Sequence, residues 1–284
     1  MNMPRSIDDI LQNVERLPTM PKAVMEIIRC VDDDNIAIDS LVQQISSDIG
    51  LSSSILKMAN THRFSVHGGI ASVHDAVMLV GFKQIRDMAC MVGVMDSFPQ
   101  HQYTLFDYAN FWRHSMGVGI CARILAKRVL DKHLGLNPDV AFISGMLHGI
   151  GQLALIAAVP DEFHIAMDYR ASHDCSLFEA EQAVLGTDHA KIGAHLARKW
   201  EFPQVICDAI EKHPAPDDAP TSHMTDLIHV SKVLCHALEI GADTHTAPPL
   251  SDHAMSRLNI NFFQLKPCFA QIECEYRNVA MMLG

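Results

Sequence analysis

The sequence predicts an all-α protein made of two helical subdomains. Apolar residues recur at helical spacing from the first residues onward, as in Ile7, Ile10, Leu11 and Val14, and clear strand alternation is missing throughout. The chain has 284 residues, of which 49% are hydrophobic and 19% are charged. This composition supports a large packed core, at a length where single cores begin to split in two.

Capping residues mark several of the predicted helix starts. A serine precedes an acidic residue by three positions at three places, a spacing in which the two side chains satisfy free backbone N–H groups at a helix start. These pairs are Ser6 with Asp9, Ser72 with Asp75, and Ser176 with Glu179. In the first half, the apolar pattern predicts helices at about residues 7–17, 21–31, 41–45, 51–60, 72–80 and 85–92.

The second half predicts longer helices. They lie at about residues 105–130 and 138–159, from Pro160 and from Ser176 onward, and at 189–200, 203–213 and 224–240, before a mixed helical and loop tail. The strongly apolar stretch 138–159 is predicted as one continuous helix. Residues 99–104 form the predicted boundary, which gives an N-terminal subdomain at 1–103 and a C-terminal subdomain at 104–284.

The composition predicts a cytoplasmic protein that does not bind nucleic acid. The N-terminus is acidic and lacks the basic-then-apolar order of a secretory signal, and no apolar run approaches the ~20 residues that a membrane-spanning helix requires. Eight scattered cysteines without a CxxC pair indicate mostly buried free thiols in a reducing compartment. A net charge of −11, with the densest basic stretch only at 123–128, disfavours contact with phosphate backbones.

Four of the seventeen histidines stand out by their surroundings. His114, His148, His189 and His213 each lie on or beside an apolar helical face. Histidine is a metal ligand and also titrates near neutral pH. A single histidine on such a face is more often a packed core residue than a ligand, so only the set as a whole indicates a site.

Six segments of the chain resemble the HDOD family. They are LPTMPKAVMEII, LVQQISSDIGLSSSILKMAN, VHDAVMLVGFKQIRDMA, FWRHSMGVGICARILA, ISGMLHGIGQLAL and GTDHAKIGAHLARKWEFPQVICDAIEKH. The similarity runs over about residues 10–240 in the order and near the spacing of the family, which makes it specific. HDOD domains are related to the HD phosphohydrolases and the HD-GYP cyclic dinucleotide phosphodiesterases. The resemblance implies a helical N-terminal subdomain followed by an HD-like helical bundle.

The same resemblance implies a remnant of the HD metal site. In the catalytic relatives, a histidine on one helix, a His-Asp pair on the next and a later Asp bind a divalent metal. His114 matches the first histidine and His148 the second. The residue after it is Gly149, so the HDIGK of the relatives reads HGIGQ here, and Gln152 replaces the lysine. The later Asp falls near Lys232.

These replacements predict that the catalytic metal site is degenerate. Carboxylates offset the charge of the metal and leave a position open for an activated water. Gly149 supplies no ligand and, inside a helix, costs ~1 kcal/mol relative to alanine. The ammonium of Lys232 repels a cation where a carboxylate would attract it. No catalytic residue and no cofactor are therefore expected. The GYP signature is also missing, because Pro214 follows His213.

An altered ligand set is the alternative. In HD-GYP relatives further histidines help to bind metals, and His189 and His213 match two of those positions. With His114 and His148 they could form an all-imidazole site for zinc, nickel, iron or manganese. The protein would then be a metal-dependent phosphohydrolase or phosphodiesterase with a His-rich ligand set. A third hypothesis is that the old cavity senses a small ligand. The GxSxG motif and the P-loop are absent, as is a GxGxxG after a strand.

The favoured hypothesis is a non-catalytic bacterial signal-transduction module that acts by binding another protein. The resemblance implies partners such as histidine kinases, response regulators or cyclic-di-GMP enzymes. The first subdomain with the loop at 66–72 is a candidate contact surface. The sequence defines neither the individual partner nor the oligomeric state.

Overall fold

The fold is entirely helical in the residues that the structure describes. A computed structural model describes residues 6–17, 19–33, 37–60, 69–98, 106–130, 132–218, 222–241 and 248–280. Helices and turns without a strand make up these ranges, so the predicted all-α fold class is confirmed. The predicted subdomain boundary at 99–104 and residues 66–68 of the loop at 66–72 lie outside the described residues.

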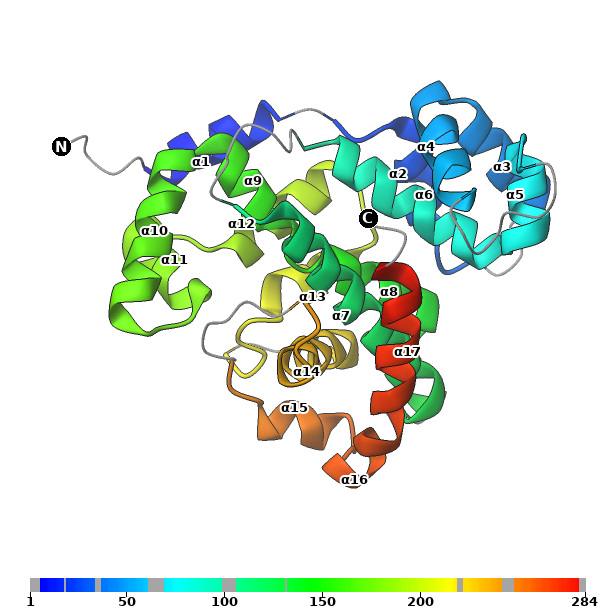
Figure 1. The fold of residues 1–284 in the computed structure, drawn as a ribbon. Coiled ribbons are helices and arrows are strands. Elements are labelled where there is room, and N and C mark those ends of the chain that lie inside the picture. Colours follow the sequence, from blue (N-terminus) through cyan, green and yellow to red (C-terminus); the bar gives the residue numbers. More distant parts are fainter. Residues whose placement is uncertain are drawn as a thin grey trace. The chain divides into compact units, whose positions relative to one another are not determined.

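Contacts divide the chain into two compact units. Unit 2 comprises Pro18–Pro99 and Trp200–Phe202, and unit 1 comprises Met1–Leu17, Gln100–Lys199 and Pro203–Gly284. Figure 1 shows the helices of both units along the chain. Each unit is described by itself below.

Unit 2 is built around its longest helix. Its helices are α2 (Lys22–Arg29), α3 (Ile38–Ser46), α4 (Ile49–Ala59), α5 (Val73–Val80) and α6 (Phe82–Asp96). The helix α6 packs against the other four. The segment 200–202 joins this unit because the Trp200 ring packs edge-on against Phe98, with 6.1 Å between ring centroids, and Arg29 forms an ion pair with Glu201 at 2.6 Å.

Unit 1 is an irregular helical bundle around α7 (Tyr108–Arg128). The other α-helices are α1 (Ile7–Glu15), α8 (Pro138–Leu147), α9 (Ile150–Ala158), α10 (Pro160–His173), α11 (Leu177–Leu185), α12 (His189–Lys199), α13 (Gln204–Lys212), α14 (His223–Ala237), α15 (Asp252–Arg257), α16 (Phe262–Leu265) and α17 (Phe269–Ala280). Two short 3₁₀ turns are η1 (Lys132–Leu134) and η2 (Lys266–Cys268). The helix α7 packs against α8, α14 and α17 (Figure 1).

Two close helix crossings bring the histidine-bearing segments together. At the crossing of α7 and α8, a Cβ added to Gly145 would lie 2.8 Å from the Cα of Gly119. At the crossing of α9 and α12, a Cβ added to Gly151 would lie 1.8 Å from the His189 carbonyl oxygen and 2.6 Å from the Gly193 nitrogen. Only glycine permits backbones to approach this closely. The start of α12 is therefore held against the start of α9.

The predicted single helix at 138–159 is wrong. The structure has α8 and α9, separated by a turn in which His148 is the C-cap of α8 and Gly149 the N-cap of α9. The imidazole of His148 donates from Nδ1 to the Gly145 carbonyl at 2.6 Å, which satisfies a carbonyl at the end of α8. The sequence pattern conceals this break because both helices are buried on nearly every side, so the apolar run continues through the turn.

The expectation that no apolar run approaches membrane-spanning length is also wrong. By length and composition alone, Pro138–Ala158 is long and apolar enough to cross a membrane. In the structure 89% of its most apolar window is buried inside the protein. Buried core segments of a protein pass the same test of composition, and this stretch belongs to the buried core of unit 1.

The local predictions from caps and cysteines are confirmed. Ser6, Ser72 and Ser176 are N-cap residues whose side chains accept the backbone N–H three positions later. All eight cysteines are free, and five of them are buried.

Candidate functional site

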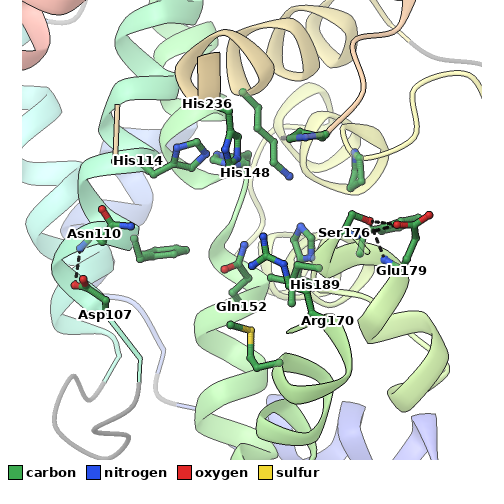
Figure 2. A pocket seen from close by; sticks show the side chains of 18 of the residues that line it. Asp107, Asn110, His114, His148, Gln152, Arg170, Ser176, Glu179, His189 and His236 are labelled. Atoms are coloured by element: carbon green, nitrogen blue, oxygen red, sulfur yellow. Dashed lines mark hydrogen bonds between the residues drawn. The ribbon is translucent and has the colours of Figure 1, made fainter. Parts of the chain in front are cut away.

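A pocket of about 410 Å³ lies in unit 1. Residues from α7, the α8–α9 turn, α10, α11, α12 and α14 line it. Figure 2 shows two polar groups that face each other across it: His114, His148 and His236, and opposite them Gln152, Arg170 and His189. An apolar wall is formed by Phe106, Phe111, Met167 and Phe178. The volume lies within the range of roughly 300–1,000 Å³ that is typical of small-molecule sites.

His148 and His213 are buried neutral imidazoles at the ends of helices. Each is a C-cap whose Nδ1–H donates to the carbonyl three residues earlier, at 2.6 Å for Gly145 and 2.9 Å for Ile210. Each ring is at most 1% exposed. Burial, and then the nearby Lys232 ammonium, lower the pKa of both histidines well below the usual range. In a neutral ring whose Nδ1 donates, Nε2 carries a lone pair that accepts a proton or a ligand.

His189 is held by a buried carboxylate. Its Nδ1 lies 2.5 Å from Oε2 of Glu181, and the same oxygen accepts the His189 backbone N–H at 2.8 Å. Both side chains are almost fully buried. The helix α12 starts here because Asp188 accepts the backbone N–H of Lys191 at 2.9 Å, the geometry of an N-cap. Glu181 thus fixes the orientation of the ring, and Nε2 of His189 has no hydrogen-bond partner among the described residues.

His114 projects from α7 beside the other rings. Its Nδ1 lies 3.2 Å from the carbonyl oxygen of Ile240, which follows α14. Its ring centroid is 5.5 Å from that of His148 and 4.9 Å from that of His236. His148 in turn contacts His213 at 5.1 Å, and His213 contacts His189 at 5.7 Å. The structure therefore places the four predicted histidines in one continuous chain of rings.

Lys232 lies at the centre of this chain of rings. Its Nζ is 3.3 Å from Nε2 of His213. Because the imidazole donates from Nδ1, this contact is one in which the ammonium donates to the ring nitrogen. Burial lowers the pKa of Lys232 to about 8, with Glu181 acting to raise it and Arg170 to lower it. At neutral pH the residue is still mainly a cation.

The nearby acid on α14 does not replace the missing carboxylate. Asp226 is fully buried, and Arg257 binds it with two nitrogens, at 2.9 Å to Oδ2 and 2.7 Å to Oδ1. Asp226 is not among the residues that line the pocket. Its oxygens are therefore engaged in a structural ion pair.

An aromatic ring takes up space beside Gly149. A Cβ added at this position would lie 3.0 Å from Cε2 of Phe111 and 3.5 Å from Nε2 of Gln152. The glycine sits in the turn between two helices, so the expected cost of a glycine inside a helix does not arise. An aspartate here would have to displace the edge of the Phe111 ring.

The residues present do not fit the divalent metal of the HD enzymes. Four imidazoles gather, but no carboxylate from the positions of the HD signature reaches them, and the ammonium of Lys232 contacts one of the candidate ligands. Within the described ranges, no group of three or more His, Cys, Asp or Glu side chains has the arrangement of a metal site. Hard cations such as manganese prefer carboxylate oxygens, which these positions do not supply.

Several residues of the site were not predicted from the sequence. Glu181, Arg170 and His236 enter it from α11, α10 and α14. Glu181 lies two residues beyond a capping glutamate and looks like an ordinary residue of an amphipathic helix. Its burial depends on the packing of α11 beside the start of α12, for which the sequence carries no local signal.

The fold and the histidine pocket define an all-helical domain of the HD-like class. A family model described as HDOD domain matches residues 17–216, and the chain belongs to this family. The predicted resemblance is confirmed. A curated relative, an uncharacterized protein of Treponema pallidum (strain Nichols), is 25% identical over 214 residues, which cover 75% of this chain and 40% of that protein. The chain thus spans less than half the length of this relative.

Solved structures share the fold over nearly the whole chain. An HDOD domain protein of unknown function from Geobacter sulfurreducens has a TM-score of 0.76 at 22% identity, covering 98% of this chain and 99% of that one. A provisionally named phosphohydrolase from Shewanella amazonensis SB2B has a TM-score of 0.71 at 25% identity, covering 97% and 98%. A provisionally named signal transduction protein from Marinobacter aquaeolei VT8 has a TM-score of 0.82 at 21% identity, covering 100% of this chain and 62% of that one.

Proposed function

We propose that this HDOD protein is a non-catalytic bacterial regulatory module, in which the ammonium of Lys232 stands where the HD enzymes hold a metal ion. The contact of 3.3 Å between Lys232 Nζ and His213 Nε2 carries this proposal. An ammonium held among imidazoles repels a divalent cation and occupies a lone pair that the cation would need.

The surroundings of Lys232 support the loss of catalysis. Gly149 provides no side-chain oxygen, and a Cβ at this position would lie 3.0 Å from Cε2 of Phe111, a tight contact. Asp226 is bound by Arg257 and cannot serve as a substitute.

The regulatory part of the proposal rests on the family and on the names of similar proteins. A structure with the same fold is named as a signal transduction protein. At 21% sequence identity, this similarity shows a shared fold and nothing more. We place this chain in the cytoplasm, in circuits of histidine kinases, response regulators or cyclic-di-GMP enzymes. It would act there by contact with another protein or by conformational coupling between the subdomains at 1–103 and 104–284.

A panel of hydrolase assays tests the absence of catalysis. The purified protein is incubated with phosphomonoesters, nucleotides and cyclic dinucleotides in the presence of manganese, iron(II) or nickel. We expect no turnover that differs between the wild type and His148→Ala. His164→Ala, on the exposed surface of α10, is the matched control. Robust turnover that His148→Ala abolishes and His164→Ala preserves would overturn the proposal.

One observation favours the second candidate, a metal-dependent hydrolase with histidine ligands. Histidines that bind metals usually donate their other ring nitrogen to a carboxylate or a carbonyl, and His189 does so to Glu181 at 2.5 Å. An ion bound by His114, His148, His189 and His213 would have to displace Lys232. Zinc, nickel, iron or manganese that copurifies at one ion per chain and is lost in His189→Ala would favour this candidate.

A further inference from the structure

We infer that the pocket of unit 1 binds a small phosphate-bearing molecule directly, without a metal ion, and that Lys232 and Arg170 receive the phosphate. The inference deepens the proposed regulatory function, because it gives the module a ligand class to sense. It rests on that function only in assuming that the phosphate is bound and left intact.

The charges that face the pocket favour an anion. Two cationic side chains, Lys232 and Arg170, line the same cavity and are close enough to influence each other's charge. Glu181 is the buried acid near them, and it already accepts two hydrogen bonds from His189. The acids at the rim, Asp107 and Glu179, accept hydrogen bonds at the starts of α7 and α11. Two cationic groups that line one cavity favour an anionic ligand there.

The hydrogen-bonding groups in the pocket are only partly used. An ammonium has three N–H donors, and the contact with His213 uses one of those of Lys232. His189 is 1% exposed and lines the pocket, and its Nε2 has no hydrogen-bond partner in the described part of the chain. A buried polar atom without a partner costs stability until a ligand or a water satisfies it. A hydroxyl of a bound phosphate ester would provide the missing partner.

The remaining wall favours a flat ring on the same molecule. Phe106, Phe111 and Phe178 line the pocket with Met167, and the rings of Phe106 and Phe111 lie 5.7 Å apart. Aromatic walls bind flat heterocycles by stacking, whichever base is present. A nucleoside monophosphate combines such a ring with a phosphate and hydroxyls. AMP is therefore the probe whose parts match both the cationic side chains and the aromatic wall.

Calorimetry with excess EDTA tests the inference on the full chain at pH 7. AMP, adenosine and inorganic phosphate are titrated separately. We expect AMP to bind at one site and adenosine to bind at least tenfold more weakly. Lys232→Met should weaken AMP binding at least tenfold, whereas Lys57→Met, an exposed lysine of unit 2, should leave it unchanged. Lys232→Arg keeps the charge and should bind AMP with an affinity within a few-fold of that of the wild type. This result would show that a substitution at position 232 leaves the pocket folded.

No heat from either AMP or phosphate at millimolar concentration would overturn the inference. Equal affinity for AMP and adenosine, or binding that Lys232→Met leaves intact, would overturn it as well.

The same protein, dialysed free of EDTA and incubated with AMP and manganese, separates this inference from the proposed function. Chromatography should recover AMP unchanged. Release of adenosine would contradict the absence of catalysis while leaving the phosphate site in place. Absence of both binding and hydrolysis would remove the phosphate site and leave the proposed function standing.

Discussion

The helix α14 carries two charged centres with opposite characters. Near its start, buried Asp226 is bound through both oxygens by Arg257. Two turns further on, Lys232 faces imidazoles and a cavity, and no carboxylate lies within ion-pair distance of it in the described ranges. The first centre is closed and serves the fold. The second centre, which we call open, lines a cavity, and the acid that acts on Lys232, Glu181, forms no ion pair with it in the described residues.

Breaking the closed centre should have the largest effect on stability. Arg257→Met leaves the Asp226 carboxylate buried without its partner, and loss of one member of a buried pair costs about 3 kcal/mol. Urea denaturation measures this loss. Arg277→Met, which removes an exposed pair with Glu273, is the control and should cost less than about 0.5 kcal/mol. Equal losses in the two variants would show that the Asp226 pair is not special.

Acid should act on the open centre through its buried histidines. The pKa values of His148 and His213 are lowered in the native protein, so below the usual histidine pKa only the unfolded chain binds these protons. The free energy of unfolding should therefore fall as the pH drops below about 6.5, by about 1.4 kcal/mol per pH unit for each histidine. Urea denaturation at several pH values gives this slope.

A variant assigns that slope to the pocket. In His148→Gln the slope should be smaller by about 1.4 kcal/mol per pH unit, since one of the histidines with a lowered pKa is removed while His213 and His229 remain. His164→Gln changes an exposed histidine and should keep the slope of the wild type. A slope that is the same in both variants would place the acid sensitivity elsewhere in the molecule.

Removing the cation of the open centre should have the smallest effect, and of opposite sign. Lys232→Met replaces a buried charge by an apolar group of similar length, which we expect to stabilise the protein by about 1 kcal/mol at pH 7. The gain should shrink between about pH 8 and 10.5, because the native wild type releases this proton at about 8 while the unfolded chain retains it. Denaturation at pH 7 and pH 10 checks both values. A loss of stability would show that Lys232 holds the fold together.

The sequence predicted those parts of the fold that depend on neighbours along the chain. Helix starts at Ser6, Ser72 and Ser176 follow from a serine and an acid three residues apart, and the structure has all three. The turn at Gly149 was missed because the apolar pattern of two buried helices runs through it. Periodicity reports which side of a helix is buried, and it loses this information when every side is buried.

The residues of the site also divide into those that the sequence predicted and those that depend on tertiary packing. Motif order pointed to His114, His148, His189 and His213, and the structure joins their rings in one chain. The partners that set their chemistry come from other helices: Glu181 holds His189, and backbone carbonyls hold His148 and His213. Such contacts depend on tertiary packing, and a single sequence does not contain them.

Metal content is the most direct measurement of the central claim, that the Lys232 ammonium takes the place of a cation. The wild type, Lys232→Asp and His148→Ala are incubated with zinc or manganese, desalted and analysed for bound metal. The account predicts well below one ion per chain in the wild type, and a gain in Lys232→Asp, where attraction replaces repulsion. One tightly bound ion per wild-type chain, lost in His148→Ala, would contradict it.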